Sequence, residues 1–484
     1  MADTAITGMS LSAMKNALSA RDISSVELVA EFRSAWEKDG ENPKPVNGYV
    51  EFFQDAEEQA QKADEARSAG SQQKLLGLPL AVKDNIQITG RQATCASKIL
   101  QGYTAPYSAT VIERLEGAGA LFLGRANMDE FAMGSSCEYS CYGAVRNPHD
   151  RDRTAGGSSG GSAALVASCQ APFALGSDTG GSVRLPASFC GVYGLKPSYG
   201  TLSRYGLVAF GSSLDQIGFL ARCPEDLHLV LSVTAGRDPH DQTSEETDFL
   251  KTETLKSRSL SGLTVGIPSE LVTDAINPEV LEVFEGYRRW LESAGAKTKI
   301  VSIPVLDACV AMYYIIAPAE ASSNLSRFDG VKYGYRTADA VNLDTMYEKT
   351  REEGFGPEVK RRILIGNYVL SSGYYDAYYK KAQAVRRMLQ DRMDEVFQEV
   401  DLLASPTSPT PPFRLGEKVD DPLSMYLTDI CTTPVNLAGL PSLSIPAGFT
   451  SEKLPVGVQI TGKKFSEITL LETAMAWERE GGVS

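Results

Sequence analysis

Residues 153–186 read Arg153-Thr-Ala-Gly-Gly-Ser-Ser-Gly-Gly-Ser-Ala-Ala164, then an apolar run, then Ser177-Asp-Thr-Gly-Gly-Ser-Val-Arg-Leu-Pro186. Two clusters of glycine and serine therefore flank one apolar stretch. That stretch predicts a short helix over 163–170, capped by Ser158 or Ser159, and a buried strand over 173–175. A helix followed by a strand returns the chain toward its starting point, so we expect Ser158 and Ser182 to lie close together.

The glycines of the two clusters predict backbone that comes close to a ligand, because glycine tolerates conformations and approaches that other residues do not. Phosphate is the usual ligand of such loops, but neither cluster has the spacing of a P-loop or of a dinucleotide-binding loop. A serine on a glycine turn beside free amides suits acyl transfer, because the amides can hold the developing oxyanion. A pair of solvent-exposed loops is the alternative that composition alone favours.

The candidate base of such a site is a lysine rather than a histidine. The three histidines, His149, His228 and His240, stand in loop-like, charged or proline-flanked contexts, which gives a Ser-His-Asp triad little support. Lys83 follows the apolar run 78–82, which predicts an inner strand that carries the amine into the interior. Burial favours the neutral amine, which can accept a proton. Taken alone, Lys83 could instead be a surface lysine with an apolar stem.

Lys83, the run Gly156-Gly-Ser-Ser-Gly-Gly-Ser162 and the run Asp178-Thr-Gly-Gly-Ser-Val-Arg184 together resemble the amidase signature family. The intervals of 75 positions from Lys83 to Ser158 and of 24 positions from Ser158 to Ser182 fit that family's pattern. The resemblance implies a Ser-Ser-Lys triad with Ser182 as nucleophile, Ser158 as bridging residue and Lys83 as base.

The same resemblance implies details of the two glycine turns. It places a cis peptide bond between Gly157 and Ser158. It also implies an oxyanion hole formed by the backbone amides of Thr179, Gly180, Gly181 and Ser182.

Other segments resemble one group of proteins within the family. Most of the chain, roughly 76–475, resembles family members that are glutaminase subunits of tRNA-dependent amidotransferases, especially in 127–136, 205–218, 236–244 and 313–328. Matching these members assigns Arg362 to the α-carboxylate of glutamine, which a guanidinium holds bidentately. It assigns Asp429 to the α-ammonium group and makes Tyr313 a further candidate for the pocket. A pocket for a zwitterion would favour glutamine over simple amides.

The resemblance also implies partners. It predicts hydrolysis of glutamine through an acyl-Ser182 intermediate and transfer of the ammonia to a B subunit. That subunit would use ATP and Mg to convert Glu-tRNA(Gln) to Gln-tRNA(Gln), with a small C subunit completing a heterotrimer. No cofactor and no metal are expected on this chain.

Two other functions stay open at this point. The first is a standalone amidase for small or aryl amides, which would need neither Arg362 nor Asp429. The second is a catalytically silent scaffold, which would not need to keep Lys83, Ser158 and Ser182.

Composition limits the remaining possibilities. A net charge of −14 argues against non-specific nucleic-acid binding by this chain alone. The eight cysteines are scattered, with Cys137 and Cys141 as half a metal site at most, and predict reduced structural thiols. No basic region followed by an apolar core opens the sequence, and no apolar run of membrane-spanning length is evident. We expect a cytoplasmic protein without a membrane span.

Apolar strands alternate with helical patterns from residue 76 onward, which predicts one large α/β domain with a mixed sheet covered by helices on both faces. We expect this amidase signature domain to span 71–484 and a helical segment, 1–70, to pack on it. Further expected elements are two helices over 9–38, a strand over 50–53, a helix over 56–68, the start of a helix in 127–136, an exposed connector over 245–262, a helix from Asn277 to Gly295, strands over 401–404 and 454–462, and a helix over 467–478.

Overall fold

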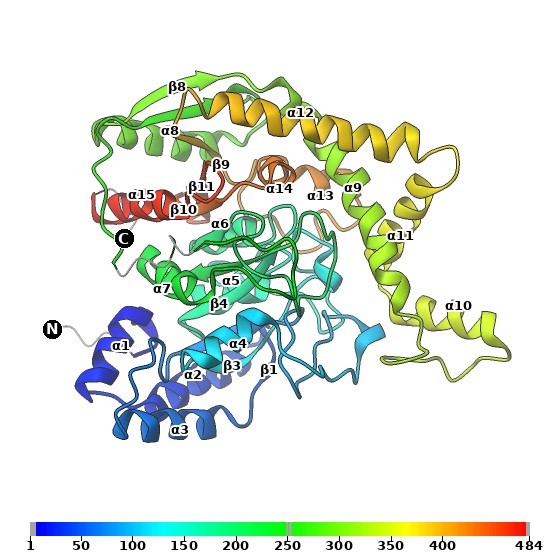
Figure 1. Cartoon of the computed structure of the whole chain (residues 1–484), viewed down its shortest axis with the longest axis horizontal. Helices are drawn as coiled ribbons and strands as arrows, with labels where there is room; N and C mark the ends of the chain where they lie inside the picture. The colour runs from blue at the N-terminus through cyan, green and yellow to red at the C-terminus, as the bar shows by residue number, and fades with distance from the viewer. Residues whose placement is uncertain (1–5, 248–249, 251–253, 481–484) are drawn as a thin grey trace.

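The computed structural model describes residues 6–247, 250 and 254–480, and its centre is an 11-stranded sheet (Figure 1). Across the sheet the strands follow the order β1-β3-β2-β4-β6-β5-β10-β11-β9-β7-β8. Their bounds are β1 Tyr49–Phe52, β2 Pro79–Lys83, β3 Leu121–Ala126, β4 Phe173–Asp178, β5 Tyr193–Lys196, β6 Gln216–Ala221, β7 Thr264–Pro268, β8 Lys297–Val301, β9 Leu402–Pro406, β10 Ser442–Phe449 and β11 Pro455–Gly462.

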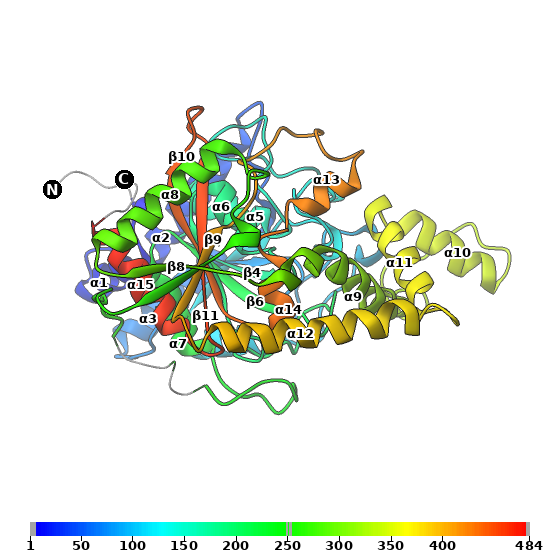
Figure 2. The same ribbon diagram turned by 90° about the horizontal axis from the view of Figure 1, so that it is seen from above.

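The sheet is mixed. Strands β3, β2 and β4 are mutually parallel, as are β9, β7 and β8, whereas the strands from β4 through β6, β5, β10 and β11 to β9 pair antiparallel. Seen from above, the strands spread like a fan around the middle of the molecule (Figure 2), as the usual twist between neighbouring strands requires.

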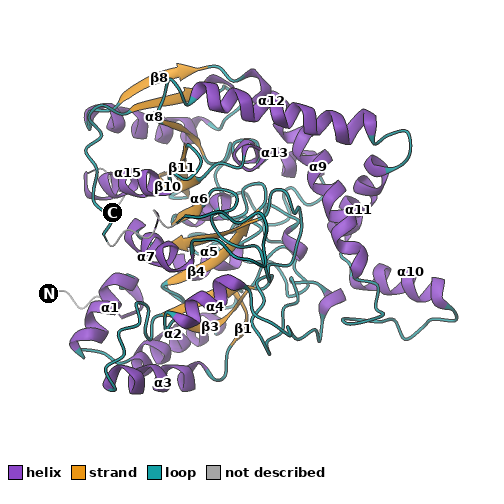
Figure 3. Ribbon diagram, viewed as in Figure 1, coloured by secondary structure: helices purple, strands orange, loops and turns teal. Residues whose placement is uncertain are grey.

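Helices cover the sheet on both faces (Figure 3), which confirms the predicted fold class. Helices α10 and α11 extend away from the sheet at one end of the molecule, beside α9 and the end of α12 (Figures 1 and 2). The bounds are α1 Leu11–Ala20, α2 Ser25–Gly40, α3 Ala56–Ser68, α4 Thr110–Gly117, α5 Gly160–Ala167, α6 Arg184–Cys190, α7 Pro224–Thr234, α8 Pro278–Ser293, α9 Cys309–Asn324, α10 Leu343–Gly354, α11 Pro357–Leu370, α12 Lys381–Val396, α13 Pro422–Leu427, α14 Thr433–Ala438 and α15 Glu467–Glu480.

The first 70 residues contain the predicted helices and strand. Ser24 caps α2 in a capping box with Glu27, where each residue's side chain accepts from the other's backbone amide. Strand β1 pairs antiparallel with β3, so this segment adds an edge strand to the main sheet. The boundary at residue 70 stays a prediction.

Several local expectations differ from the structure. Helix α5 starts at Gly160, and Ser159 occupies the N-cap position without capping it, because its hydroxyl is engaged elsewhere. Segment 127–136 is a loop with one 3-10 turn, Glu130–Ala132, since Phe131 adopts φ 50°. The predicted connector 245–262 lies partly outside the described residues, and so do residues 1–5.

Helix α9 belongs to the core. By length and composition alone, the helical stretch Pro304–Arg327 could cross a membrane, but 56% of its most apolar window is buried in the molecule. It packs against α11, α12 and α14. Most of its apolar side chains are therefore buried within the fold.

Candidate active site

The sheet brings the two predicted catalytic regions to one edge. Lys83 is the last residue of β2, and Asp178 is the last residue of β4, which pairs in parallel with β2. Because parallel strands end at the same edge, Lys83 lies beside the turn Thr179–Ser182 that follows β4. The peptide bond between Gly157 and Ser158 is cis, in agreement with the family resemblance.

Lys83 lies in a shell of serine oxygens. Its Nζ is 2.8 Å from both Ser158 Oγ and Ser159 Oγ and 2.9 Å from Ser177 Oγ, and it also donates to the Ser177 carbonyl at 3.3 Å. The lysine side chain is fully buried. The hydroxyl oxygens solvate the amine without offering it a carboxylate partner.

Burial lowers the pKa of Lys83 to about 7, while nearby groups, including the carboxylates of Asp129 and Asp178, act in the opposite direction. A substantial fraction of the amine is therefore neutral at physiological pH. A neutral amine at 2.8 Å from Ser158 Oγ can accept the proton of that hydroxyl.

Ser182 stands at the end of the turn and is 7% exposed. Its carbonyl accepts from the Ser159 amide at 3.0 Å, which joins the two glycine clusters through the backbone. Within the described residues no hydrogen bond links Ser158 Oγ to Ser182 Oγ. The structure thus places Lys83 against Ser158, while the proton path from Ser182 to Ser158 stays a prediction.

The amides of the turn differ in their bonding. The Gly181 amide donates to Asp178 Oδ1 at 2.8 Å, so this predicted oxyanion donor already has an acceptor. In the part of the chain that the structure describes, the amides of Thr179, Gly180 and Ser182 donate to no protein acceptor. These three are the donors available to an oxyanion.

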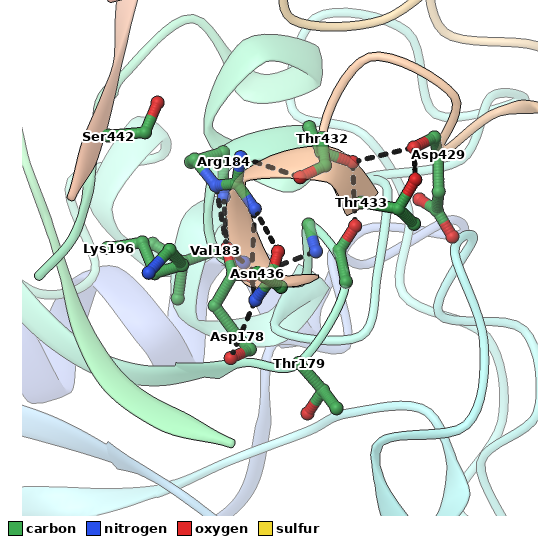
Figure 4. A network of polar contacts seen from close by, with 12 residues as sticks. Asp178, Thr179, Val183, Arg184, Lys196, Asp429, Thr432, Thr433, Asn436 and Ser442 are labelled. Carbon is green, nitrogen blue, oxygen red and sulfur yellow. Dashed lines mark hydrogen bonds and ion pairs between the residues drawn. The ribbon is translucent and has the colours of Figure 1, made fainter. Parts of the chain in front are cut away.

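A buried ion pair between Arg184 and Asp178 lies beside the turn (Figure 4). Arg184 contacts both carboxylate oxygens of Asp178 at 3.1 Å and donates to the carbonyl of Thr432 and the side chains of Asn436 and Gln459. Burial by itself would raise the pKa of Asp178, but Arg184 and its neighbours hold that pKa at about 2. The carboxylate therefore stays charged and keeps its bonds to the turn.

Arg362 is buried and belongs to α11. Its Nε donates to Glu358 Oε1 at 2.8 Å, and its guanidinium lies 5.2 Å from the ring centre of Tyr314 and 5.4 Å from that of Tyr426. Glu358 thus holds Nε. An Arg362 fixed in this way can present its remaining N–H groups to a carboxylate.

Asp429 is also buried, with Oδ2 accepting from Ser135 Oγ at 2.6 Å. Burial raises the pKa of Asp429 to about 7, although Ser135 and Arg362 lower it. Tyr313 lies against the catalytic turn, because a Cβ added to Gly180 would be 2.6 Å from its ring. The structure therefore places Tyr313 beside the turn and puts Asp429 within the electrostatic reach of Arg362.

The sequence did not predict the hydrogen-bond partners that fix the predicted site residues in place. Ser177 and Ser159 complete the shell around Lys83, while Ser135 and Glu358 hold Asp429 and Arg362. Ser159 and Ser177 stand inside or next to the quoted motifs and could have been found by their adjacency. Glu358 stands four positions before Arg362 on one helix, which is a recognisable ion-pair spacing.

The chain belongs to the amidase family, whose model matches residues 35–471 and confirms the resemblance seen in the sequence. Among its relatives is the A subunit of the glutamyl-tRNA(Gln) amidotransferase of Treponema denticola, at 53% identity over 98% of this chain and 99% of the relative. The crystal structure of the corresponding subunit from Thermotoga maritima is 40% identical with a TM-score of 0.80, covering 99% of this chain and 96% of that one. A peptide amidase from Stenotrophomonas maltophilia is 26% identical with a TM-score of 0.79, covering 97% and 96% of the two chains.

Proposed function

We propose that this chain is the glutamine-hydrolysing A subunit of a glutamyl-tRNA(Gln) amidotransferase. Relatives of that name match it over nearly their whole length at about half identity. The observation that carries the chemistry is the buried Lys83 with Nζ 2.8 Å from Ser158 Oγ, beside a turn with free amides.

In the proposed reaction, Ser182 Oγ attacks the side-chain amide carbon of glutamine. Its proton passes to Ser158, whose own proton passes to the neutral Lys83. The amides of Thr179, Gly180 and Ser182 stabilise the oxyanion of the tetrahedral intermediate. The C–N bond then breaks, and the proton held by Lys83 returns through Ser158 to the departing nitrogen, which leaves as ammonia.

The second half of the reaction removes the acyl group. Water attacks the ester carbon on Ser182, and Lys83 takes a proton from the water through Ser158. The ester bond breaks, Ser182 recovers its proton, and glutamate is released. One water is consumed for each ammonia and glutamate formed.

Substrate choice would rest on the charges of the pocket. Arg362 would bind the α-carboxylate and Asp429 the α-ammonium group, with Tyr313 lining the pocket beside Gly180. An amide without these charges would leave both buried groups without the charged partners that glutamine brings, which is the kind of mismatch that enzymes discriminate against most strongly.

Partners complete the proposal. The ammonia would pass to a B subunit that uses ATP and Mg to convert Glu-tRNA(Gln) to Gln-tRNA(Gln), and a C subunit would complete a cytoplasmic heterotrimer. This chain itself would need no cofactor. The acidic net charge of −14 is consistent with tRNA being held by a partner.

The test is ammonia release from glutamine by the purified chain, alone and then with the B and C subunits, ATP and Glu-tRNA(Gln). We expect strong stimulation by the complete mixture together with formation of Gln-tRNA(Gln). High activity of the isolated chain with a preference for simple amides would instead identify a standalone amidase.

A further inference from the structure

Asp215 is a buried carboxylate next to the catalytic turn, and the mechanism above gives it no role. Strand β4 pairs antiparallel with β6, and the register sets Asp178 opposite Gln216. One step beyond this pair, the residue after Asp178 faces the residue before Gln216. The sheet itself therefore sets Thr179, the first residue of the turn, opposite Asp215.

The contacts agree with this register. Thr179 Oγ1 donates to Asp215 Oδ1 at 2.7 Å. Asp215 also accepts from two backbone amides, Gly211 N at 3.0 Å through Oδ1 and Phe210 N at 2.9 Å through Oδ2. Asp215 is 3% exposed and Thr179 1% exposed, so water does not compete for these bonds.

Three side chains form hydrogen bonds with the catalytic turn, Thr179–Ser182. Asp178 accepts from the Gly181 amide, Thr432 Oγ1 donates to the Gly180 carbonyl at 2.7 Å, and Asp215 accepts from the Thr179 side chain. Among the contacts of the described residues, only the bond from Asp215 fixes the Thr179 side chain, at the start of the turn. Rotation of the peptide planes around Thr179 would turn the neighbouring amides away from an oxyanion.

The charge state of Asp215 supports this arrangement. Burial raises the pKa of Asp215 to about 6, while the bonds from Thr179, Gly211 and Phe210 lower it. The group is therefore mainly a carboxylate at pH 7.5, and it accepts all three bonds.

We propose that Asp215 is a positioning residue that orients the oxyanion amides by holding the side chain of Thr179. The proposal rests on the proposed function for the identity of the amide that is cleaved. It deepens that function by assigning control of the turnover step to a residue outside the triad. Asp215 touches no reacting atom and acts through Thr179.

Asp215 could also act through a second neighbour, Phe210. An experiment can distinguish this route from the one through Thr179. Asp215 holds the Phe210 amide, and the Phe210 ring centre lies 5.7 Å from the guanidinium of Arg362. If Asp215 acted mainly through Phe210, its loss would disturb the grip on the α-carboxylate and raise KM. If it acts through Thr179, its loss lowers kcat.

The experiment is a double-mutant cycle on the full-length chain, read as kcat and KM for glutamine hydrolysis in the complete amidotransferase. Asp215→Ala should lower kcat about 30-fold, somewhat less than the complete loss of one oxyanion donor, with KM changed less than about threefold. Thr179→Val, which removes only the hydroxyl, should lower kcat about 10-fold. The double variant should be no worse than about threefold below Asp215→Ala, because both changes remove one interaction.

Two conservative variants serve as matched controls. Thr179→Ser keeps the hydroxyl and should restore most of the kcat that Thr179→Val loses. Asp215→Asn keeps one oxygen for Thr179 and should restore most of the kcat that Asp215→Ala loses. Melting temperatures identify any variant that fails to fold. If the aspartate variants fail to fold, the comparison of Thr179→Val with Thr179→Ser still tests whether the bond between Thr179 and Asp215 supports kcat.

The proposal would be overturned by any one of three results. These are losses of kcat that multiply in the double variant, a rise in KM with unchanged kcat, and equal activity of Thr179→Val and Thr179→Ser. Failure of the proposed function looks different, because the wild-type chain would then hydrolyse simple amides and not glutamine. The same cycle measured on such an amide would still decide the role of Asp215, since any amide passes through an oxyanion.

Discussion

Lys83 Nζ and Ser158 Oγ lie 2.8 Å apart in the interior of the protein, although 75 positions separate the two residues in the chain. The contact exists because β2, which ends at Lys83, is a parallel neighbour of β4, and Ser158 lies in the loop that precedes α5 beside these strands. Lys83 and Ser158 are thus brought together by the sheet and not by local sequence.

Replacing Lys83 by methionine should remove the base while preserving an apolar side chain of similar length. We expect glutamine hydrolysis to fall at least about 10³-fold, because no other base among the described residues bonds to the Ser158 hydroxyl. The melting temperature should stay within a few degrees of the wild type, since a buried amine is replaced by a thioether. Residual activity above one tenth of the wild type would contradict the assignment of Lys83 as base.

Ser158 and Ser159 form a matched pair, because each hydroxyl lies 2.8 Å from Lys83 Nζ. Ser158→Ala should abolish glutamine hydrolysis to the same extent as Ser182→Ala, since residues that act as a unit lose activity together. Ser159→Ala should retain activity within about 10-fold, because Ser159 solvates Lys83 but does not relay a proton. Steady-state ammonia release checks both; equal loss in the two variants would rule out a specific relay through Ser158.

Arg362 and Arg361 allow a second matched comparison, because both form ion pairs with Glu358 and only Arg362 is buried. Arg362→Lys should raise KM for glutamine about 10- to 100-fold, because an ammonium cannot bind a carboxylate bidentately. Arg361→Ala should change KM by less than about twofold, as its ion pair is partly exposed. An unchanged KM in Arg362→Lys would move the carboxylate site elsewhere.

The pH dependence of glutamine hydrolysis should follow two groups that must both have lost a proton. Lys83 must be neutral and Asp429 must be ionised, and the pKa of each is about 7. Both requirements are met above this value and lost below it, so kcat/KM should rise with pH through about 7. Asp429→Asn should raise KM and remove the pH dependence contributed by Asp429, while the dependence of kcat on Lys83 remains. A flat profile between pH 6 and 8 would contradict both pKa values.

The sequence predicts the fold class and the predicted triad better than the strand order and the loops around that triad. Glycine spacing, the apolar run before Lys83 and the family resemblance were enough to predict the fold class and the contact between Lys83 and Ser158. The order of the strands could not be predicted, since β6, β5 and β10 pair across long stretches of sequence. The loop at 127–136 has no helical or strand period, because the positive φ of Phe131 and side chains such as Ser135 determine its path.

The contacts in the proposed glutamine pocket could not be predicted from the sequence either. The family resemblance assigned Arg362 and Asp429, but nothing in the sequence around Ser135 indicates that its hydroxyl reaches Asp429 from 294 positions away. Long-range side-chain bonds of this kind depend on the packing of several elements at once. They become visible only in the structure.

Arg184 should be essential for stability. Arg184→Ala leaves the Asp178 carboxylate buried without its ion pair, which should cost about 3–5 kcal/mol of unfolding free energy. The matched control is Arg387→Ala, whose ion pair with Asp391 is largely exposed and should contribute less than about 1 kcal/mol. Urea unfolding of both variants checks the difference; equal stabilities would mean that the turn does not depend on the buried pair.

The partners of Arg184 also have a consequence for biosynthesis. Its guanidinium contacts Thr432, Asn436 and Gln459, which follow it by 248, 252 and 275 positions. A ribosome adds these residues long after Ser182 has left the exit tunnel, so a nascent chain holds Ser182 on a turn that still lacks the partners of Arg184. Nascent chains and fragments that end before residue 430 should therefore release no ammonia, which couples the onset of a reactive, nitrogen-liberating activity to completion of the polypeptide.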